Sequence, residues 1–323
     1  LGENTTSGPK MDFNHAWNGA MEFNENIFFT LLNFDKIENL TRISPIYLIV
    51  ISLINKVLNS FELTRLFLFF LITLCQLFLY KILKKIYYPN KTSDKKILFF
   101  LSCIIFISPS FRSNAIWPES AMLGLLFFLI STYFYLKFKN NEKIRYSFLN
   151  ILFLAIASYI RPSFCLFGIF FYYEFFIYFL KNKNYLRNIF YITLLNLFLA
   201  FPAYYYIFIV DVFFIEEGGL SSNYFNKIPI IASIIFFHIL PILIYKKFNL
   251  GFNYKHDLGI FILILLSLTL IIKNFDYNIN LSGGGIILHA SNFLLDNNIL
   301  LFVCYPLFIY FLIKISIFKN YNN

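Results

Sequence analysis

Apolar runs that approach the thickness of a bilayer recur along the chain from residue 65 onward. Crossing about 30 Å of hydrocarbon takes roughly 20 apolar residues in an α-helix, and fewer where the bilayer thins. Short polar segments separate the runs, and this pattern predicts an all-α, polytopic integral membrane protein with about nine transmembrane helices. The predicted spans fall at about 65–82, 97–110, 119–136, 147–160, 163–180, 188–210, 229–245, 258–272 and 298–316.

The residues before the first span form two segments of different character. Residues 1–45 are mainly polar, and we expect them to form a long external loop of the kind that carries catalytic groups. The run "IYLIVISLINKVL" is apolar but short, and it reaches Lys56 near its end. It predicts a helix at 46–60 that lies in the membrane interface. With a transmembrane bundle over 61–323, these segments are expected to form one domain, 1–323.

The composition indicates that lipid is the solvent for most of the chain. Of the 323 residues, 59% are hydrophobic and only 14% are charged, whereas a soluble domain has roughly 25% charged residues. The four cysteines all lie in apolar runs and lack the spacing of a metal site. The sequence therefore predicts neither a disulfide framework nor a structural metal site.

The basic residues gather in alternate polar segments, which predicts the side that each segment faces. If 46–58 does not cross the membrane, one side receives 18 Lys and Arg against three acids. Segments rich in Lys and Arg face the cytoplasm. We therefore expect a bacterial inner (plasma) membrane protein whose site faces the periplasm or exterior. Sidedness also explains the net charge of +10, so no nucleic-acid partner is expected.

The opening segment holds the first candidate residues, because "MDFNHAW" places Asp12 close to His15 and Trp17. An acid in a polar segment is often only solvated. A segment of about 45 residues without predicted structure, however, is uncommon unless it has a function. A carboxylate here suits a general base toward a hydroxyl acceptor, or a ligand of a divalent cation. Asp12 is thus the catalytic candidate, and His15 and Trp17 are substrate-binding candidates.

Two arginines lie just outside predicted spans, Arg112 in "SPSFRSNAIWPES" and Arg161 in "YIRPS". An arginine at a helix end commonly reaches toward lipid headgroups. Both, however, lie on the side that is poor in basic residues, and a guanidinium fork also suits the phosphate of a lipid-linked substrate. Glu119 follows Pro118 and is expected to cap the next helix, with substrate binding as its second role.

Two further residues carry weaker signals. His289 follows three consecutive glycines in "SGGGIILHASNF". A glycine-rich turn can present backbone N–H groups to a phosphate, which makes His289 a substrate-binding candidate, and a flexible loop is the alternative. Glu174 is an acid inside a predicted span. It indicates either a functional group or a buried hydrogen bond to a tyrosine.

The order of these features resembles a known family. An external segment with an acid and aromatic residues precedes "SPIYL" (44–48), "LTRLF" (63–67), "SPSFRSNAIWPES" (108–120) and "AIASYIRPSF" (155–164). In this order the chain is similar, over residues 10 to about 180, to polytopic glycosyltransferases of the GT-C fold, especially the protein-O-mannosyltransferase and aminoarabinose-transferase group. The first helix of that family would precede Leu1, so the resemblance implies a fragment.

The resemblance implies an activity and leaves alternatives open. It implies inverting transfer of a sugar from a polyprenyl-phosphate donor to a hydroxyl acceptor on a glycan, lipid or protein. The Asp12 carboxylate itself, rather than the resemblance, makes a divalent cation at the Asp12 loop the candidate cofactor. The family often has Asp-Glu in its first loop; here Phe13 follows Asp12, which leaves Glu22 or Glu25 as the second acid. A polysaccharide polymerase-type membrane enzyme and a multi-span transporter are the alternatives. A transporter is expected to show internal repeats, and the sequence shows no clear one.

Overall fold

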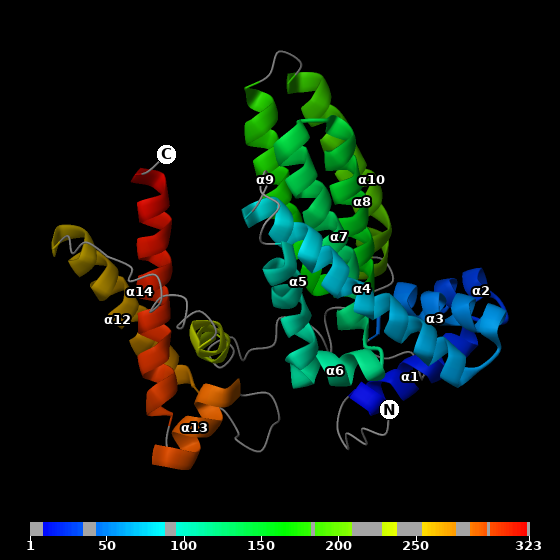
Figure 1. Cartoon of the computed structure of the whole chain (residues 1–323), viewed down its shortest axis with the longest axis horizontal. Coiled ribbons are helices and arrows are strands. Elements are labelled where there is room, and N and C mark those ends of the chain that lie inside the picture. The colour runs from blue at the N-terminus through cyan, green and yellow to red at the C-terminus, as the bar shows by residue number, and fades with distance from the viewer. Residues whose placement is uncertain are drawn as a thin grey trace. The chain divides into compact units, whose positions relative to one another are not determined.

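A computed structural model describes residues 9–34, 43–87, 95–181, 185–208, 228–237, 254–275, 285–295 and 298–321. Within these ranges every regular element is a helix, which confirms the all-α expectation (Figure 1). The chain divides into two compact units, Leu1–Gly218 and Gly219–Asn323, and each is described by itself. The expectation of a single domain over 1–323 stays a prediction.

The segment expected as an external loop contains two helices, α1 (Pro9–Glu22) and α2 (Ile27–Leu32). Pro9 suits the start of α1, because the first N–H groups of a helix have no partner within it. Phe13, Ala16 and Ala20 recur at helical spacing along α1 and are buried. The expectation of a loop is wrong for these two stretches, because a narrow apolar stripe among polar residues is enough to pack a helix.

The helix predicted at 46–60 is present as α3 (Pro45–Leu58). With 14 residues it is too short to cross a bilayer. Among its own residues, Tyr47 and Ile51 are buried. The Ser52 hydroxyl donates a hydrogen bond of 2.7 Å to the Asn24 side chain, which joins α3 to the turn after α1. Helices α1 and α3 therefore pack together as one layer.

Four helical segments of the first unit are long and apolar enough to cross a membrane, among the residues that the structure describes. They indicate an integral membrane protein in a lipid bilayer; the count of about nine spans stays a prediction. These four segments belong to α4 (Phe61–Tyr87), α7 (Ser120–Asn141), η3 (Pro162–Cys165) with α9 (Leu166–Leu180), and α10 (Tyr185–Phe208).

Shorter helices complete both units. In the first unit they are α5 (Lys95–Cys103), η2 (Ile104–Ile107), α6 (Pro109–Ile116) and α8 (Ile144–Ile160). The second unit has a helical stretch at 228–237, followed by α12 (Tyr254–Asn274), α13 (Gly285–Leu295) and α14 (Ile299–Tyr321). There the Tyr305 hydroxyl donates a hydrogen bond of 3.2 Å to Ser267, which links α14 to α12.

Helices α7 and α8 form an antiparallel hairpin with extensive contact. The chain reverses at Glu142, whose backbone is left-handed (φ 56°, ψ 16°). Inside the hairpin, the Ser131 hydroxyl donates to the Asn150 carbonyl (2.9 Å), and the Asn150 amide donates to the Ser131 carbonyl (3.0 Å). Such bonds between helices in lipid each contribute about 0.6–2 kcal/mol. The hairpin places the start of α7 and the end of α8 at the same end of the unit.

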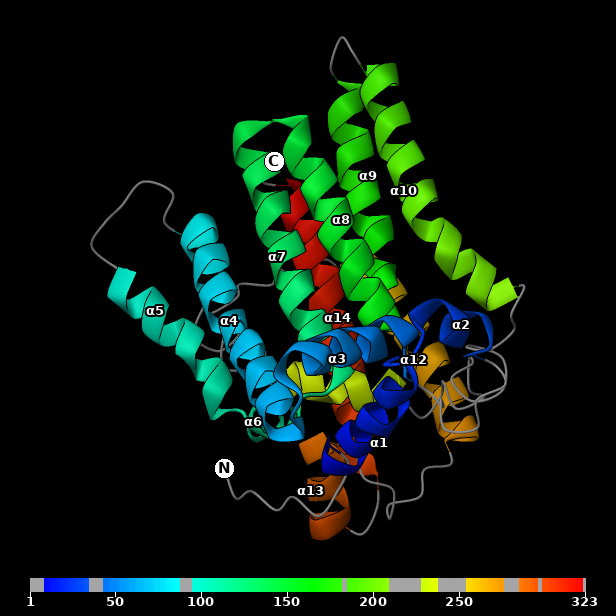
Figure 2. The same ribbon diagram turned by 90° about the vertical axis from the view of Figure 1, so that its right-hand side faces the viewer.

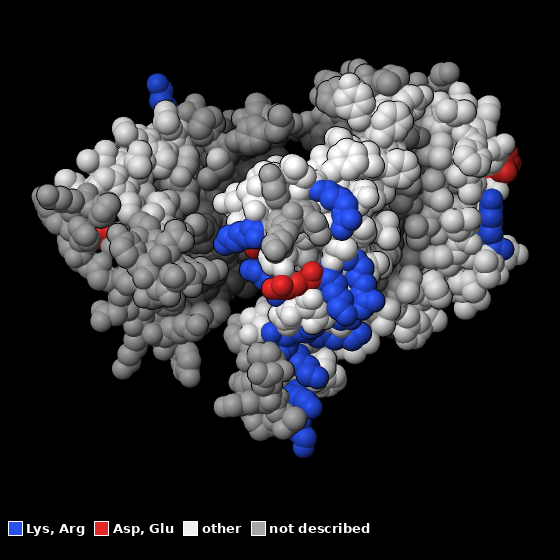
Figure 3. Space-filling view, turned by 90° about the horizontal axis from the view of Figure 1, so that it is seen from above, with Lys and Arg blue, Asp and Glu red and all other residues white. Residues whose placement is uncertain are grey.

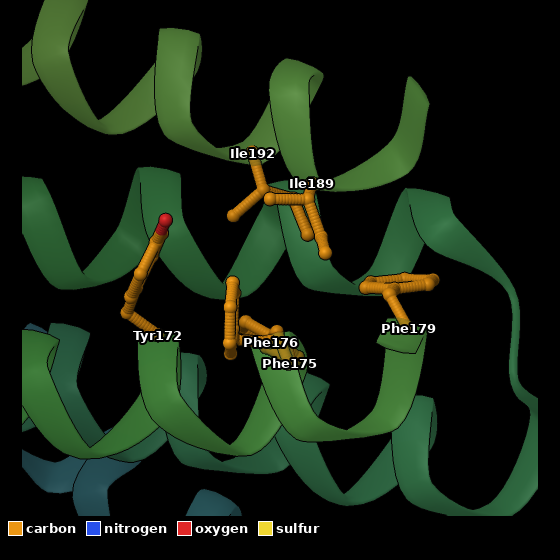
Figure 4. A pocket seen from close by; sticks show the side chains of 6 residues that line it. All are labelled: Tyr172, Phe175, Phe176, Phe179, Ile189 and Ile192. Carbon is orange, nitrogen blue, oxygen red and sulfur yellow. The ribbon is translucent and has the colours of Figure 1, made fainter. Parts of the chain in front are cut away.

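Helices α9 and α10 meet through large side chains. Figure 4 shows the rings of Phe175 and Phe179 on α9 facing Ile189 and Ile192 on α10. This contact leaves no space for a water molecule. It is therefore a packed part of the bundle rather than a binding site.

Glu174 has a structural role on α9. Its carboxylate accepts a hydrogen bond of 2.5 Å from the Tyr135 hydroxyl on α7 and pairs with Lys139 at 3.3 Å. This confirms the tyrosine hydrogen bond that the sequence left open. A carboxylate with these partners joins α7 to α9.

The two ends of the first unit differ in charge. We call the end where α7 finishes and α8 begins the basic end, and the opposite end the cavity end. In Figures 1 and 2 the helices α1, α3 and α6 all lie at the cavity end. Figure 3 shows Lys and Arg side chains gathered on the basic end. The described charged residues there are Lys81, Lys84, Lys85, Lys95, Lys96, Lys137, Lys139, Glu142, Lys143, Arg145, Glu174, Lys181 and Arg187.

Gly124→Ala tests how closely α7 must approach the end of α8. A Cβ at this position would lie 2.9 Å from the Phe164 ring and 3.1 Å from the Cβ of Arg161. We expect a loss of about 1–3 kcal/mol of folding free energy, seen as a lower thermal unfolding midpoint in detergent. Gly168→Ala is the control, because its Cβ would meet only Leu154, at 3.7 Å. Equal midpoints for the two variants would contradict the close approach.

Cysteine labelling tests whether the two ends face opposite sides of a membrane. The four native cysteines are first replaced by Ala, and Lys143→Cys or Glu25→Cys is then introduced singly. The two positions lie at opposite ends of the unit, and both are exposed. An impermeant maleimide added to sealed vesicles should label only one of them, and the other should react after the vesicles are opened. Labelling of both from the same face would contradict the arrangement of the spans.

Candidate functional site

A cavity of about 230 Å³ lies at the cavity end of the first unit. Four segments that are far apart in the sequence build it: α1, the start of α3, the turn between α6 and α7, and the end of α8. The residues that line it are Asp12, Ala16, Ile43, Tyr47, Pro118, Glu119, Ser120 and Arg161. Three of the residues selected from the sequence, Asp12, Glu119 and Arg161, thus meet around one space.

Two hydroxyl groups from the start of α3 hold the walls of the cavity together. The Tyr47 hydroxyl donates to the Pro118 carbonyl, and the Ser44 hydroxyl donates to the Tyr159 carbonyl. Tyr159 lies in the last turn of α8, where carbonyl groups have no partner within the helix. Burial raises the pKa of Tyr47, so its phenol keeps the proton that it donates. The start of α3 therefore fixes both the α6–α7 turn and the end of α8.

Arg161 is positioned by the proline that follows it. A residue before proline avoids the α conformation, and Arg161 is extended (φ −139°, ψ 104°), which ends α8. Its N–H still donates to the Ala157 carbonyl at 2.8 Å, and its own carbonyl accepts from the Phe164 N–H at 3.1 Å. These bonds fix the backbone while the residue stays exposed and lines the cavity.

Glu119 occupies the N-cap position of α7, as expected, with an extended backbone (φ −96°, ψ 149°). Its side chain, however, makes no capping hydrogen bond, and it lines the cavity instead. Burial raises the pKa of the Glu119 carboxyl; the charge of Arg161 opposes this shift and that of Asp12 adds to it. The three charged groups therefore act on one another across a shared space.

Asp12 reaches the cavity because it lies on a helix rather than a loop. It is in the first turn of α1, where a negative charge interacts favourably with the helix dipole. The buried Phe13 and Ala20 fix the rotation of α1 about its own axis. Asp12 and Ala16, one helical turn apart, therefore both face the cavity. Asp12 is exposed to solvent.

The other candidates lie outside the cavity lining. His15 is exposed on α1, and Arg112 is exposed on α6. The Trp17 ring packs edge-on against Phe61, with 4.9 Å between ring centroids, so its observed role is packing. His289 belongs to α13 of the second unit, and its side chain lies outside the described residues.

The second acid of the cavity comes from an unexpected place. Glu22 and Glu25 were the candidates because they follow Asp12 closely in sequence, but both are exposed and neither lines the cavity. Glu119 takes this position, from a turn more than a hundred residues later. Tyr47 and Ser44 were also missed, although "SPIYL" was noted as a motif. Only contacts between distant segments reveal their roles.

Trp117 lies beside the cavity and contacts both α1 and α4. The residue is 92% buried. Its ring centroid lies 6.4 Å from that of Phe13, and the Arg65 guanidinium lies 4.3 Å from the Trp117 centroid. Arg65 also pairs with Glu62 at 2.6 Å. These contacts hold the start of α4 against the turn that carries Glu119.

The described residues include no group of three or more His, Cys, Asp or Glu that could hold a metal ion. In the cavity, Asp12 and Glu119 are oxygen donors of the kind that Mg²⁺ and Ca²⁺ prefer, but those ions usually take six or more ligands. The guanidinium of Arg161 lines the same space and opposes a cation. A divalent cation at Asp12 therefore stays a prediction.

The raised pKa of Glu119 predicts a pH dependence of stability. The folded state holds this proton more tightly than the unfolded state, so stability is highest below the ordinary value of 4.5 and falls as pH rises through the folded pKa. We expect Glu119→Gln to remove part of this fall in the thermal midpoint measured from pH 4.5 to neutrality. Glu22→Gln, at an exposed position on α1, is the control. Parallel curves for wild type and Glu119→Gln would contradict the burial of this carboxyl.

Comparisons with known proteins identify no relative of this chain. No family model, no curated protein and no solved structure matches this chain. The resemblance to GT-C glycosyltransferases therefore remains a prediction from the sequence, and the cavity is the observation on which a proposed function must rest.

Proposed function

We propose that the protein is a membrane glycosyltransferase that transfers a sugar from a polyprenyl-phosphate donor to a hydroxyl acceptor. The observation that carries the proposal is the cavity in which Asp12, Glu119 and Arg161 meet at the end of a bundle of apolar helices. A carboxylate that can accept a proton and a guanidinium that can stabilise a departing phosphate suit the transfer of a sugar from a phosphate.

The reaction assigns a role to each charged group. The acceptor hydroxyl oxygen forms a bond to the anomeric carbon, while the bond from that carbon to the phosphate oxygen breaks. Asp12 takes the proton of the hydroxyl as general base. The leaving polyprenyl phosphate gains negative charge, which the guanidinium of Arg161 stabilises with two parallel N–H donors.

Glu119 suits a different role from Asp12. Its raised pKa favours the protonated carboxyl, which can donate a hydrogen bond to a sugar hydroxyl or a phosphate oxygen. Two neighbouring carboxyls whose environments differ commonly divide acid and base roles in this way. We assign proton acceptance to the exposed Asp12 and substrate binding to the more buried Glu119.

The size and place of the cavity fit a lipid-linked sugar. Its volume of about 230 Å³ is below the roughly 300–1,000 Å³ of sites for drug-sized ligands, so it suits one sugar ring. The polyprenyl chain would lie in the bilayer along the apolar helices, with its phosphate at the level of the cavity. Because the basic end is the one expected to face the cytoplasm, the reaction is placed on the periplasmic or exterior face of a bacterial plasma membrane.

Asp12→Asn tests the general base. Full-length protein in lipid vesicles is supplied with a panel of labelled polyprenyl-phosphate sugars, and the released polyprenyl phosphate is measured. We expect a 10²- to 10⁴-fold lower rate for the variant, the usual contribution of a general base. Glu22→Gln, on the same helix but outside the cavity, should keep the wild-type rate. Equal rates for wild type and Asp12→Asn would place the base elsewhere.

Arg161→Gln tests the stabilisation of the leaving phosphate. We expect a rate about 10²- to 10³-fold lower, because an ion pair formed in the transition state is lost. Arg112→Gln should have a smaller effect, since Arg112 does not line the cavity. The opposite order would move the phosphate to α6. If folded wild-type protein releases no lipid phosphate from any donor, the proposed function is wrong, and uptake into vesicles becomes the next assay.

A further inference from the structure

Three cations of the basic end of the first unit lie over the rings of Tyr133 and Tyr146. They are Lys81 in the last turns of α4, Lys137 in the last turns of α7, and Arg145 in the first turn of α8. Lys137 lies 4.9 Å from the centroid of the Tyr133 ring and 5.4 Å from that of Tyr146. The cluster thus joins three helices at the end opposite the cavity.

The rings also hold the two outer cations in place. The ammonium of Lys81 lies 4.7 Å from the Phe78 centroid and 5.8 Å from that of Tyr133. The guanidinium of Arg145 lies 4.9 Å from the Tyr146 centroid and donates a hydrogen bond of 3.0 Å to the Tyr146 hydroxyl. Tyr133 and Tyr146 each lie near two cations, so the two rings link the three positive groups into one cluster.

No carboxylate of the described residues pairs with this cluster. Among the described residues, no acid lies within 4.0 Å of the charged atoms of Lys81, Lys137 or Arg145. Lys139, two residues from Lys137, differs because it pairs with Glu174 at 3.3 Å. The like charges of the three unpaired cations repel one another, and an anion that contacts all of them would remove that repulsion.

The position of the cluster identifies the anion. The cations lie where the apolar helices α4 and α7 finish and α8 begins, which is the level of lipid headgroups for helices that cross a bilayer. Tyrosine is enriched at this level because its ring is apolar and its hydroxyl is polar. Basic pockets between transmembrane helices bind the headgroups of anionic lipids.

We propose that Lys81, Lys137 and Arg145, with Tyr133 and Tyr146, form a binding site for the headgroup of an anionic phospholipid. The phosphate accepts hydrogen bonds from the two lysines and the arginine, and the acyl chains lie against the apolar faces of α4 and α8. The site lies at the end opposite the cavity and does not depend on the proposed transferase activity. Its role is to bind an annular lipid and so join α4 to the α7–α8 hairpin.

Native mass spectrometry of the full chain in detergent tests this site. The protein is titrated with phosphatidylglycerol and, separately, with phosphatidylcholine of the same acyl chains. We expect wild type to bind phosphatidylglycerol more tightly. The combined variant Lys81→Gln, Lys137→Gln and Arg145→Gln should bind it about tenfold or more weakly while its affinity for phosphatidylcholine is unchanged, since each base near a lipid surface contributes substantially.

A matched variant separates this site from a diffuse positive surface. Lys95→Gln, Lys96→Gln and Lys181→Gln together remove the same charge from exposed positions at the same end, where no ring contact is observed. This variant should keep the preference for phosphatidylglycerol. An equal loss in both triple variants, or no preference in wild type, would overturn the proposal. If the thermal midpoint shows that the first triple variant does not fold, the single variant Lys137→Gln replaces it in the titration. Lys137 is chosen because it contacts both tyrosines, and Lys137→Gln should bind phosphatidylglycerol more weakly than wild type does.

Discussion

The close approach of α7 and α8 is the interaction on which the rest of the first unit depends. Lipid provides no hydrophobic drive between helices, so small residues and polar contacts must hold them. Gly124 leaves the space that Phe164 and Arg161 occupy, and Ser131 and Asn150 bond the helices to each other. Because the hairpin is tight and antiparallel, Glu119 before α7 and Arg161 after α8 lie at the same end.

Prolines and hydroxyl groups convert that hairpin into a cavity. Pro118 lies before Glu119 in the break between α6 and α7, and Pro162 lies after Arg161 where α8 ends; carbonyls at these breaks lack helical partners. The hydroxyls of Tyr47 and Ser44 on α3 bond to carbonyls at these two breaks. A buried hydroxyl needs a partner, and so does a carbonyl at a helix end, so each satisfies the other. Helix α1 packs against α3, and this contact places Asp12 across the opening.

Charge divides the unit into two ends with different chemistry. The cavity end has acids and bases in similar number around a small polar space, which suits a reaction at a phosphate. The basic end has a large excess of Lys and Arg, and three of them lie over shared aromatic rings without a carboxylate partner among the described residues. Apolar helices separate the two ends, so the proposed transfer reaction and the proposed lipid site act independently on the two faces of the bilayer.

The sequence by itself determined the all-α class, the positions of the four long apolar helices, the short helix α3 and the uneven distribution of charge, because length, periodicity and composition are local properties. It also singled out Glu119 and Arg161, since prolines mark the helix ends beside them. Only the tertiary structure decided that Asp12 lies on a helix, that its acidic neighbour is Glu119 rather than Glu22 or Glu25, and that Tyr47 joins the walls. The physical reason is distance along the chain: the hydroxyl bonds of α3 link residues 71 and 115 positions apart, and no local pattern encodes such pairings.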